Sequence, residues 1–313
     1  MVRLEQNMSY TLNQLRIFVK IVEKESITKA SEELFLTQPA VSIQLKKFQD
    51  QFDISLTEVI GRKLYVTDFG REIARTCKKI LDEVEVINYK AHSHNNMLAG
   101  KLKIASASTG KYVAPFFLSA FMKEHKGVDL DLDVTNRKDA LEQLEKNKVD
   151  FAFVSVLPKK MNIKGLSLLT NKLYFVGKKG LCASQSDIKD CLKEYPILLR
   201  EEGSATRKET ERYIESHKLK INRKVTLKSN EALKQAIIAG IGYSIMPLIG
   251  LKYAIESGEI EIYPLDGFPI LTEWNLIWLK EKNLSPVAEE FVKHLQTDKD
   301  NIMEEHFSWY EKY

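Results

Sequence analysis

The sequence predicts an α/β protein in which a small helical unit precedes a longer half of alternating strands and helices. Apolar residues between Thr11 and Phe52 recur at helical spacing in three short bursts. A longer helical pattern follows, and after Gly100 short strand patterns alternate with helix patterns. A chain of 313 residues is long enough for two or three compact units.

The composition is that of a globular protein. Hydrophobic residues make up 44% and charged residues 29%, which suits a sizeable core. The net charge of +4 permits a polyanionic partner but does not identify one, because lysines and acidic residues are interleaved. No apolar run approaches the roughly 20 residues that span a bilayer, and the N-terminal stretch lacks the apolar segment of a signal peptide. We therefore expect a cytoplasmic protein without a membrane partner.

The third helical burst has the pattern of a helix that enters a DNA groove. It begins at Thr37, a candidate N-cap, and Pro39 is tolerated in its opening turn. Its inward stripe consists of Val41, Leu45 and Phe48, and its outward side is small and lightly charged, formed by Pro39, Ser42, Ile43 and Lys46. The stretch 61–67 then predicts a β-wing that places Arg62 and Lys63 near phosphate. A plain three-helix bundle is the alternative.

The run SITKASEELFLTQPAVSIQLKKFQDQF, followed by GRKLYVTDFG, resembles the winged helix-turn-helix of LysR-type transcriptional regulators. The resemblance implies double-stranded DNA as a partner and residues 1–67 as the DNA-binding domain. The residues expected to contact DNA are Thr37, Gln38, Pro39, Ser42, Ile43, Lys46, Arg62 and Lys63. Ile43 stands where the family usually has arginine, and isoleucine offers a thymine methyl only apolar contact. We therefore expect a half-site that favours A·T pairs.

Residues 68–96 predict one long helix that carries an apolar seam. The seam falls at alternating spacings of four and three, at Ile73, Cys77, Ile80, Val84, Ile87 and Ala91. It predicts a homodimer through the same helix of a second copy and hence a roughly palindromic operator. The alternative is a helix that packs on its own domain. In the resembling family this segment is the linker dimerisation helix, and we expect further assembly into a homotetramer, with RNA polymerase as a further partner.

The second half alternates strands and helices in two series, which predicts a mostly parallel sheet and two lobes. The resemblance implies a two-lobed, periplasmic-binding-protein-like effector domain. Lobe I is expected at 101–168 and 268–297, lobe II at 169–267, and the polar stretch 298–313 as a C-terminal tail or short helix.

Hydroxyl, amide and guanidinium groups follow several strands or begin helices in this half. Helix N-termini attract anions, and arginine offers forked donors to a carboxylate or phosphate. We therefore expect a small anionic metabolite as effector, bound between the lobes by Ser106, Ser108, Thr109, Asn136, Ser155, Arg200, Ser204, Thr206, Arg207 and Asn230. Each residue alone also fits a plainer role, since Ser and Thr often only cap helices and Arg207 could pair with Glu211.

The segments LREEGSATR and SNEALKQAIIAGIGYSIMP resemble the branch of LysR-type regulators that controls Calvin-cycle carboxylase (RuBisCO) operons. The resemblance implies that the chain senses a phosphorylated or redox metabolite. The sequence contains no nucleophile elbow, P-loop, zinc-protease helix or dinucleotide fingerprint, so we expect no enzyme, no cofactor and no metal site. The alternatives are a constitutive DNA-binding regulator without a ligand and a solute-binding module of a transporter.

Overall fold

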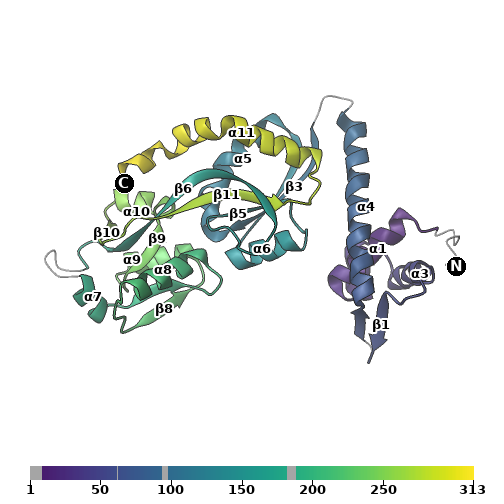
Figure 1. Cartoon of the computed structure of the whole chain (residues 1–313), viewed down its shortest axis with the longest axis horizontal. Coiled ribbons are helices and arrows are strands. Elements are labelled where there is room, and N and C mark those ends of the chain that lie inside the picture. The colour runs from purple at the N-terminus through teal and green to yellow at the C-terminus, as the bar shows by residue number, and fades with distance from the viewer. Residues whose placement is uncertain (1–8, 62, 94–97, 182–187) are drawn as a thin grey trace. The chain divides into compact units, whose positions relative to one another are not determined.

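The computed structural model describes residues 9–61, 63–93, 98–181 and 188–313. The chain divides into two compact units, Met1–Asn96 and Met97–Tyr313. Figure 1 labels their helices and strands. No helix in the described ranges is both long and apolar enough to cross a membrane.

The first unit is a helical bundle with a two-stranded wing. Its elements are α1 (Leu12–Lys24), α2 (Ile27–Glu33), α3 (Gln38–Gln49), β1 (Thr57–Ile60), β2 (Lys63–Val66) and α4 (Asp68–Ser93). Thr11 and Gln14 form a capping box at the start of α1, and the Ser26 hydroxyl caps α2. The third helix begins after Thr37 as predicted, with Pro39 in its first turn, although the Thr37 hydroxyl makes no capping bond.

The first half of α4 packs on its own unit, against α1. Ala74 and Cys77 belong to the buried core, and Ile73 packs against it. Burial raises the pKa of the Cys77 thiol to about 11, so the thiol stays protonated near neutral pH. The predicted seam for a partner helix is therefore wrong at Cys77, because the chain's own core already covers this side chain, whereas Ile73 is only half-buried.

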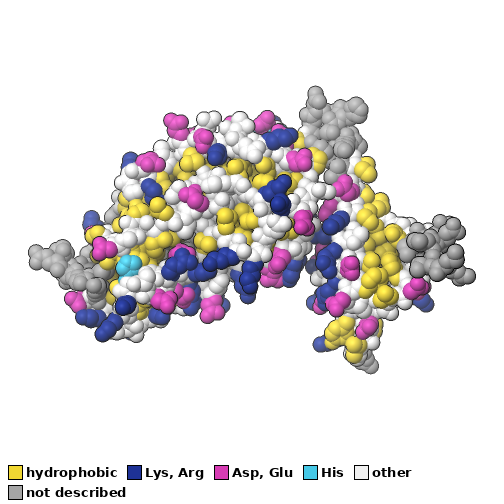
Figure 2. Space-filling view, in the orientation of Figure 1, with side chains coloured by type: hydrophobic (Ala, Val, Ile, Leu, Met, Phe, Trp, Pro, Cys, Tyr) yellow, Lys and Arg dark blue, Asp and Glu magenta, His cyan; other side chains and the backbone are white. Residues whose placement is uncertain are grey.

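The second half of α4 keeps apolar side chains in solvent. Ile87 is 64% exposed, Ile80 is also exposed, and Val84 is half-buried. The side chain of Ala91 lies outside the described residues. Hydrophobic side chains gather over α4 and its neighbouring helices and again at the wing (Figure 2). Because Ile80 and Ile87 lie seven residues apart on this helix, they share one face that its own core leaves uncovered.

The second unit is built on a seven-stranded mixed sheet with the strand order β10-β6-β11-β5-β3-β4, and β9 also pairs with β6. The elements are β3 (Ala99–Ala107), η1 (Ser108–Tyr112), α5 (Ala114–Glu124), β4 (Gly127–Thr135), α6 (Arg137–Glu145), β5 (Phe151–Val154), β6 (Ile163–Lys178), α7 (Ile188–Glu194), β7 (Ile197–Arg200), α8 (Ala205–Ser216), β8 (Lys224–Leu227), α9 (Asn230–Ile238), β9 (Ser244–Pro247), η2 (Leu248–Gly250), α10 (Lys252–Glu256), β10 (Ile260–Ile262), β11 (Ile270–Leu279), α11 (Pro286–Phe307) and η3 (Ser308–Lys312).

Only part of this sheet is parallel, so the expectation of a mostly parallel sheet is wrong. β3 pairs with β4 and β5 in parallel, whereas β11 runs antiparallel to β5 and β6, and β9 and β10 run antiparallel to β6. β7 and β8 form a separate parallel pair. The long strands β6 and β11 lie side by side over most of their length (Figure 1).

Among the described residues, two of the hydrophobic cores of the second unit lie along β6 and β11. We call the first the α6 core; its buried residues are Ala105, Ala140, Leu144, Val149, Ala152, Val154 and Ile277. We call the second the β7 core; its buried residues are Leu173, Phe175, Cys191, Leu192, Ile197, Leu199, Tyr213, Tyr243 and Ile245. Two cores joined by continuous strands suit two lobes. The lobe boundaries given above stay a prediction.

The C-terminal stretch is not a separate tail. The expected boundary after residue 297 falls inside α11, which continues to Phe307. Ile302, Phe307 and Tyr310 are buried. The Lys172 ammonium on β6 donates to the carbonyl oxygens of Tyr310 (3.0 Å) and Tyr313 (2.9 Å). The apolar residues between the charges of this stretch thus pack onto the second unit.

Candidate DNA-binding surface and effector site

The outward side of α3 lies in solvent as its spacing predicts. Gln38, Pro39 and Lys46 are exposed, and Ile43 is 53% exposed. Ser42 is half-buried beside them. The inward stripe of Val41, Leu45 and Phe48 is buried in the core of the first unit. The helix therefore presents small, polar and apolar side chains to solvent, with Lys46 and Lys47 exposed in its last turn, and this face could approach base edges.

The wing is a short antiparallel hairpin. Ile60 pairs with Lys63 at its tip, and the φ angle of Gly61 is +55°. The Lys63 side chain is exposed, while Arg62 lies outside the described residues. Gly70 in α4 approaches the wing base so closely that a Cβ there would lie 2.0 Å from the carbonyl oxygen of Leu56. This contact fixes the wing against the start of α4.

Sequence reasoning missed two apolar side chains beside α3. Phe35 is 96% exposed, and Leu36 next to it is exposed as well. Both lie in the turn between α2 and α3, where the φ angle of Phe35 is +54°. A bulky residue in the left-handed region is uncommon, and two apolar residues in a short turn were the signal available in the sequence. They add exposed apolar surface in the turn that precedes α3.

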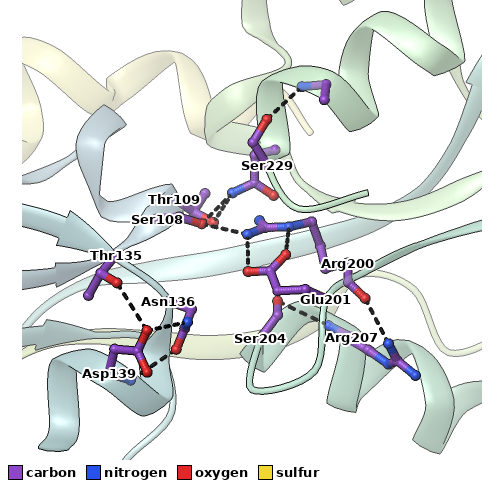
Figure 3. A network of polar contacts seen from close by, with 12 residues as sticks. Ser108, Thr109, Thr135, Asn136, Asp139, Arg200, Glu201, Ser204, Arg207 and Ser229 are labelled. Atoms are coloured by element: carbon purple, nitrogen blue, oxygen red, sulfur yellow. Dashed lines mark hydrogen bonds and ion pairs between the residues drawn. The ribbon is translucent and has the colours of Figure 1, made fainter. Parts of the chain in front are cut away.

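In the second unit, four predicted effector residues meet in what we call the polar bridge: Ser108, Thr109, Arg200 and Asn230. The Asn230 amide donates to Thr109 Oγ1 (2.7 Å) and Ser108 Oγ (3.2 Å), and Arg200 Nη2 donates to Ser108 Oγ (3.0 Å) (Figure 3). Ser108 and Thr109 belong to η1 after β3, whereas Arg200 ends β7 and Asn230 begins α9. The bridge thus joins elements beside the two cores.

The guanidinium of Arg200 is held by a residue that the sequence analysis did not single out. Its Nε donates to Glu201 Oε2 (2.9 Å) and its Nη2 to Glu201 Oε1 (2.8 Å), which makes a two-pronged ion pair. Arg200 is only 2% exposed. A buried guanidinium requires an anionic partner, and an acidic residue directly after the arginine at a strand end was the available signal.

A second contact spans the same two parts of the unit. Tyr112 in η1 donates its hydroxyl to Glu231 Oε2 in α9 (3.1 Å). Burial, followed by the neighbouring charge of Glu231, raises the pKa of Tyr112 to about 12. The phenol is therefore a donor throughout the neutral range. Asn230 and Glu231 both open α9, so this helix start is fixed to η1 at two points.

The loop after Arg200 leads into α8. The Ser204 hydroxyl caps α8 by accepting from the Arg207 backbone amide (3.4 Å), as the sequence allows. Arg207 donates through Nη1 to the carbonyl oxygen of Arg200 (3.2 Å) and through Nε to Glu211 (2.8 Å). Arg207 thus forms the ion pair with Glu211 that its spacing allows, and it also supports the loop that follows Arg200. Thr206 is buried in the first turn of α8.

A groove of about 810 Å³ lies between α6 and α8. Ser204 and Arg207 line it, together with residues of α6 such as Arg137 and Lys138. Arg137 donates to the carbonyl oxygens of Val156 (2.8 Å) and Leu157 (3.0 Å), and its burial lowers its pKa from the usual value. The residues of the polar bridge do not line this groove, so the structure separates the predicted residues into two neighbouring groups.

The other predicted residues make local contacts. Asn136 caps α6 through its Oδ1, which accepts from the Asp139 amide (2.9 Å), and its Nδ2 donates to the Asp139 carboxylate (2.7 Å; Figure 3). Ser106 is fully buried and donates to the carbonyl oxygen of Ala107 (3.1 Å). Its Oγ also faces Gly110, so packing around Ser106 argues against contact with a ligand. Ser155 is half-buried after β5.

Residues 9–61, 63–93, 98–181 and 188–313 contain no group of three or more histidine, cysteine, aspartate or glutamate side chains that could hold an ion.

Comparison with known proteins identifies both units. Residues 12–71 match the family of bacterial regulatory helix-turn-helix proteins of the LysR type, and residues 95–299 match the LysR substrate-binding domain. The HTH-type transcriptional activator CmpR of Synechocystis sp. is 34% identical over 287 residues, which cover 91% of this chain and 94% of CmpR. A RuBisCO operon transcriptional regulator of Allochromatium vinosum is 32% identical, over 91% of this chain and 95% of its own length.

A solved structure extends the likeness to the second unit. The regulatory domain of CcmR from Synechocystis, in complex with 2-PG, is 29% identical with a TM-score of 0.59, and the match covers 64% of this chain and 98% of that domain. The resemblance to regulators of RuBisCO operons is confirmed by these relatives, which are transcriptional regulators and not enzymes. The chain therefore belongs to the LysR family of DNA-binding transcriptional regulators.

Proposed function

We propose that a small anion, bound beside the polar bridge, controls how this regulator binds its operator. The observation that carries this proposal is the bridge itself, in which a buried arginine and three neutral polar side chains from η1, β7 and α9 meet. A site of this kind suits a carboxylate or phosphate, for which arginine is a forked donor. The CcmR domain, which holds 2-PG, supports an anion as the effector class.

On the DNA side, we propose that α3 enters the major groove and that Lys63 approaches the backbone. The exposed residues of α3 include two cations, Lys46 and Lys47, together with Gln38 and Ile43. Contacts to phosphate supply affinity and contacts to base edges supply specificity. The proposed base contacts are therefore those of Gln38, Ser42 and Ile43, and the half-site favours A·T at Ile43.

We further propose that two copies associate through the second half of α4. Ile80 and Ile87 are exposed on one face of this helix, and a partner helix would cover them. A symmetric dimer places two copies of α3 on a roughly palindromic operator. A homotetramer and contact with RNA polymerase extend the same proposal. The protein acts in the cytoplasm, because its DNA target lies there.

The test uses the full chain and a DNA fragment from upstream of its own gene. Binding is followed by fluorescence anisotropy with and without 2-PG, and thermal unfolding is followed in parallel. An effector at ~100 times its dissociation constant should stabilise the protein by ~2.7 kcal/mol. We expect 2-PG both to raise the unfolding temperature and to change operator affinity.

A protein that binds the fragment but responds to no anion in either assay would instead be the constitutive regulator. A protein that binds anions but no DNA would contradict the assignment of α3 and the wing.

A further inference from the structure

In this structure, Arg200 of the polar bridge already binds an anion, and that anion is the side chain of Glu201. Arg200 directs Nε and Nη2 at the two carboxylate oxygens of Glu201, at 2.9 Å and 2.8 Å. This is the geometry in which arginine binds a free carboxylate or two oxygens of a phosphate. Because one guanidinium edge cannot grip two carboxylates at once, an effector and Glu201 must compete for it.

Two features favour a movement of the Glu201 side chain that leaves the strand holding Arg200 in place. The Glu201 side chain is 18% exposed, whereas that of Arg200 is 2% exposed. The next residue, Glu202, has a side chain that is 92% exposed, so the loop runs at the surface here. A change of side-chain rotamer at Glu201 would therefore move its carboxylate into solvent while Arg200 stays in place.

The other contacts of Arg200 persist through such an exchange. Its Nη2 also donates to Ser108 Oγ (3.0 Å), and its carbonyl oxygen accepts from Arg207 Nη1 (3.2 Å). The guanidinium therefore keeps its position and meets an anion both before and after the exchange. This matters because a buried charge without a partner is strongly destabilising.

We propose that Glu201 is an internal competitor that occupies the anion subsite of the ligand-free protein. An effector with a carboxylate or phosphate group binds by taking the place of the Glu201 carboxylate on Arg200. This inference rests on the proposed function and deepens it, because it names the group that the effector displaces. The exchange on Arg200 also favours ligands that present two oxygens to one edge of the guanidinium, and it disfavours neutral ligands.

The test compares Glu201→Gln with wild type and with Glu202→Gln in the full chain. A glutamine amide has one acceptor oxygen and turns its NH₂ group toward the guanidinium, so it competes poorly. Glu202→Gln removes the same charge one residue away and leaves the ion pair between Arg200 and Glu201 in place. Binding of 2-PG and of inorganic phosphate is measured by calorimetry, and melting without ligand shows whether each variant folds.

We expect Glu201→Gln to bind 2-PG about tenfold more tightly than wild type, which is the difference between a charge-assisted and a neutral hydrogen bond. Glu202→Gln should stay within about twofold, because its charge is screened by solvent. If Glu201→Gln does not fold, Glu201→Asp tests the same point, since a carboxylate one methylene shorter cannot reach both nitrogens in this geometry.

Equal affinities of the Glu201 and Glu202 variants, or weaker binding by Glu201→Gln, would overturn the competitor role and leave the proposed effector site standing. No binding of either anion by the wild type or by any variant would overturn the proposed function itself. Binding by the Glu201 variants alone would support the competitor role most directly.

Discussion

Replacing Thr109 by valine tests whether the polar bridge couples ligand binding to the arrangement of the second unit. Valine keeps the branched shape of threonine and removes only the hydroxyl. Thr109 Oγ1 accepts the shorter of the two hydrogen bonds from the Asn230 amide, at 2.7 Å compared with 3.2 Å for Ser108. Both Thr109 and Asn230 are buried.

The expected cost follows from that burial. Loss of one partner of a buried hydrogen bond destabilises the folded state by about 1–3 kcal/mol, and we expect the lower part of that range because the Asn230 amide keeps Ser108 Oγ as an acceptor. For a unit of this size each kcal/mol lowers the unfolding temperature by about 2–4 °C. Because the bond joins η1 to α9, its loss also disfavours the arrangement in which these two elements are in contact, which we call the joined arrangement. If the effector binds that arrangement, a coupling free energy of about 1–3 kcal/mol corresponds to a ligand midpoint that is about 5–150-fold higher.

The assay is a titration of the operator complex with 2-PG, together with urea unfolding. We expect Thr109→Val to leave operator affinity without ligand unchanged and to move the ligand midpoint to higher concentration. Thr135→Val is the control, because the Thr135 hydroxyl donates to Asp139 on the adjacent α6, at 3.4 Å, and takes no part in the polar bridge. A folded Thr109 variant that no longer binds the operator would refute the division of labour between the two units.

Further predictions concern the first unit. Lys63→Ala should weaken binding to all DNA sequences and reduce the slope of log affinity against log salt by about 1, measured by anisotropy at several salt concentrations. Ile43→Arg should shift selection from a random DNA pool toward guanine at the contacted base pair; a guanine already required by the wild type would contradict the proposed A·T contact. Ile87→Glu should shift sedimentation toward the monomer, and an unchanged dimer would place the interface elsewhere. Gly70→Ala should lower the free energy of unfolding by about 3 kcal/mol, because its Cβ meets backbone; Gly61→Ala, with open space around it, should cost about 1 kcal/mol through its positive φ alone.

The local structure of the first unit was predictable because its signals are short-range. Ser26 and the proline after Gln38 mark helix starts, and the 3.6-residue period separates Val41 from Ile43. The same period does not indicate which part of the protein, or which partner, covers an apolar stripe of a helix. Cys77 and Ile87 belong to one seam in the sequence, yet the first lies in the unit's own core and the second in solvent.

In the second unit, the sequence indicated which polar residues end strands and begin helices, but not which of them meet. Ser108 and Asn230 are 122 positions apart, and only the fold brings them to 3.2 Å. Ser106 and Thr109 carry similar hydroxyls near the same strand end, yet one is packed against Gly110 and the other joins the bridge. Side-chain direction at a strand end depends on one residue of register, which composition does not reveal.

The geometry also limits how far the protein can switch by itself. Four hydrogen bonds join η1 to Arg200 and to the start of α9: three in the bridge and one from Tyr112 to Glu231. At about 1 kcal/mol net for an ordinary hydrogen bond, they favour the joined arrangement by a few kcal/mol. To change the ratio of the two arrangements from 1:99 to 99:1 requires about 5.5 kcal/mol.

An effector must therefore add free energy of its own, and Arg200 is the group in the bridge with a full charge to offer. If Glu201 already holds that charge, the effector gains only the difference between two anions. A tight response then requires contacts beyond Arg200, and the neighbouring groove between α6 and α8 is where such contacts can form.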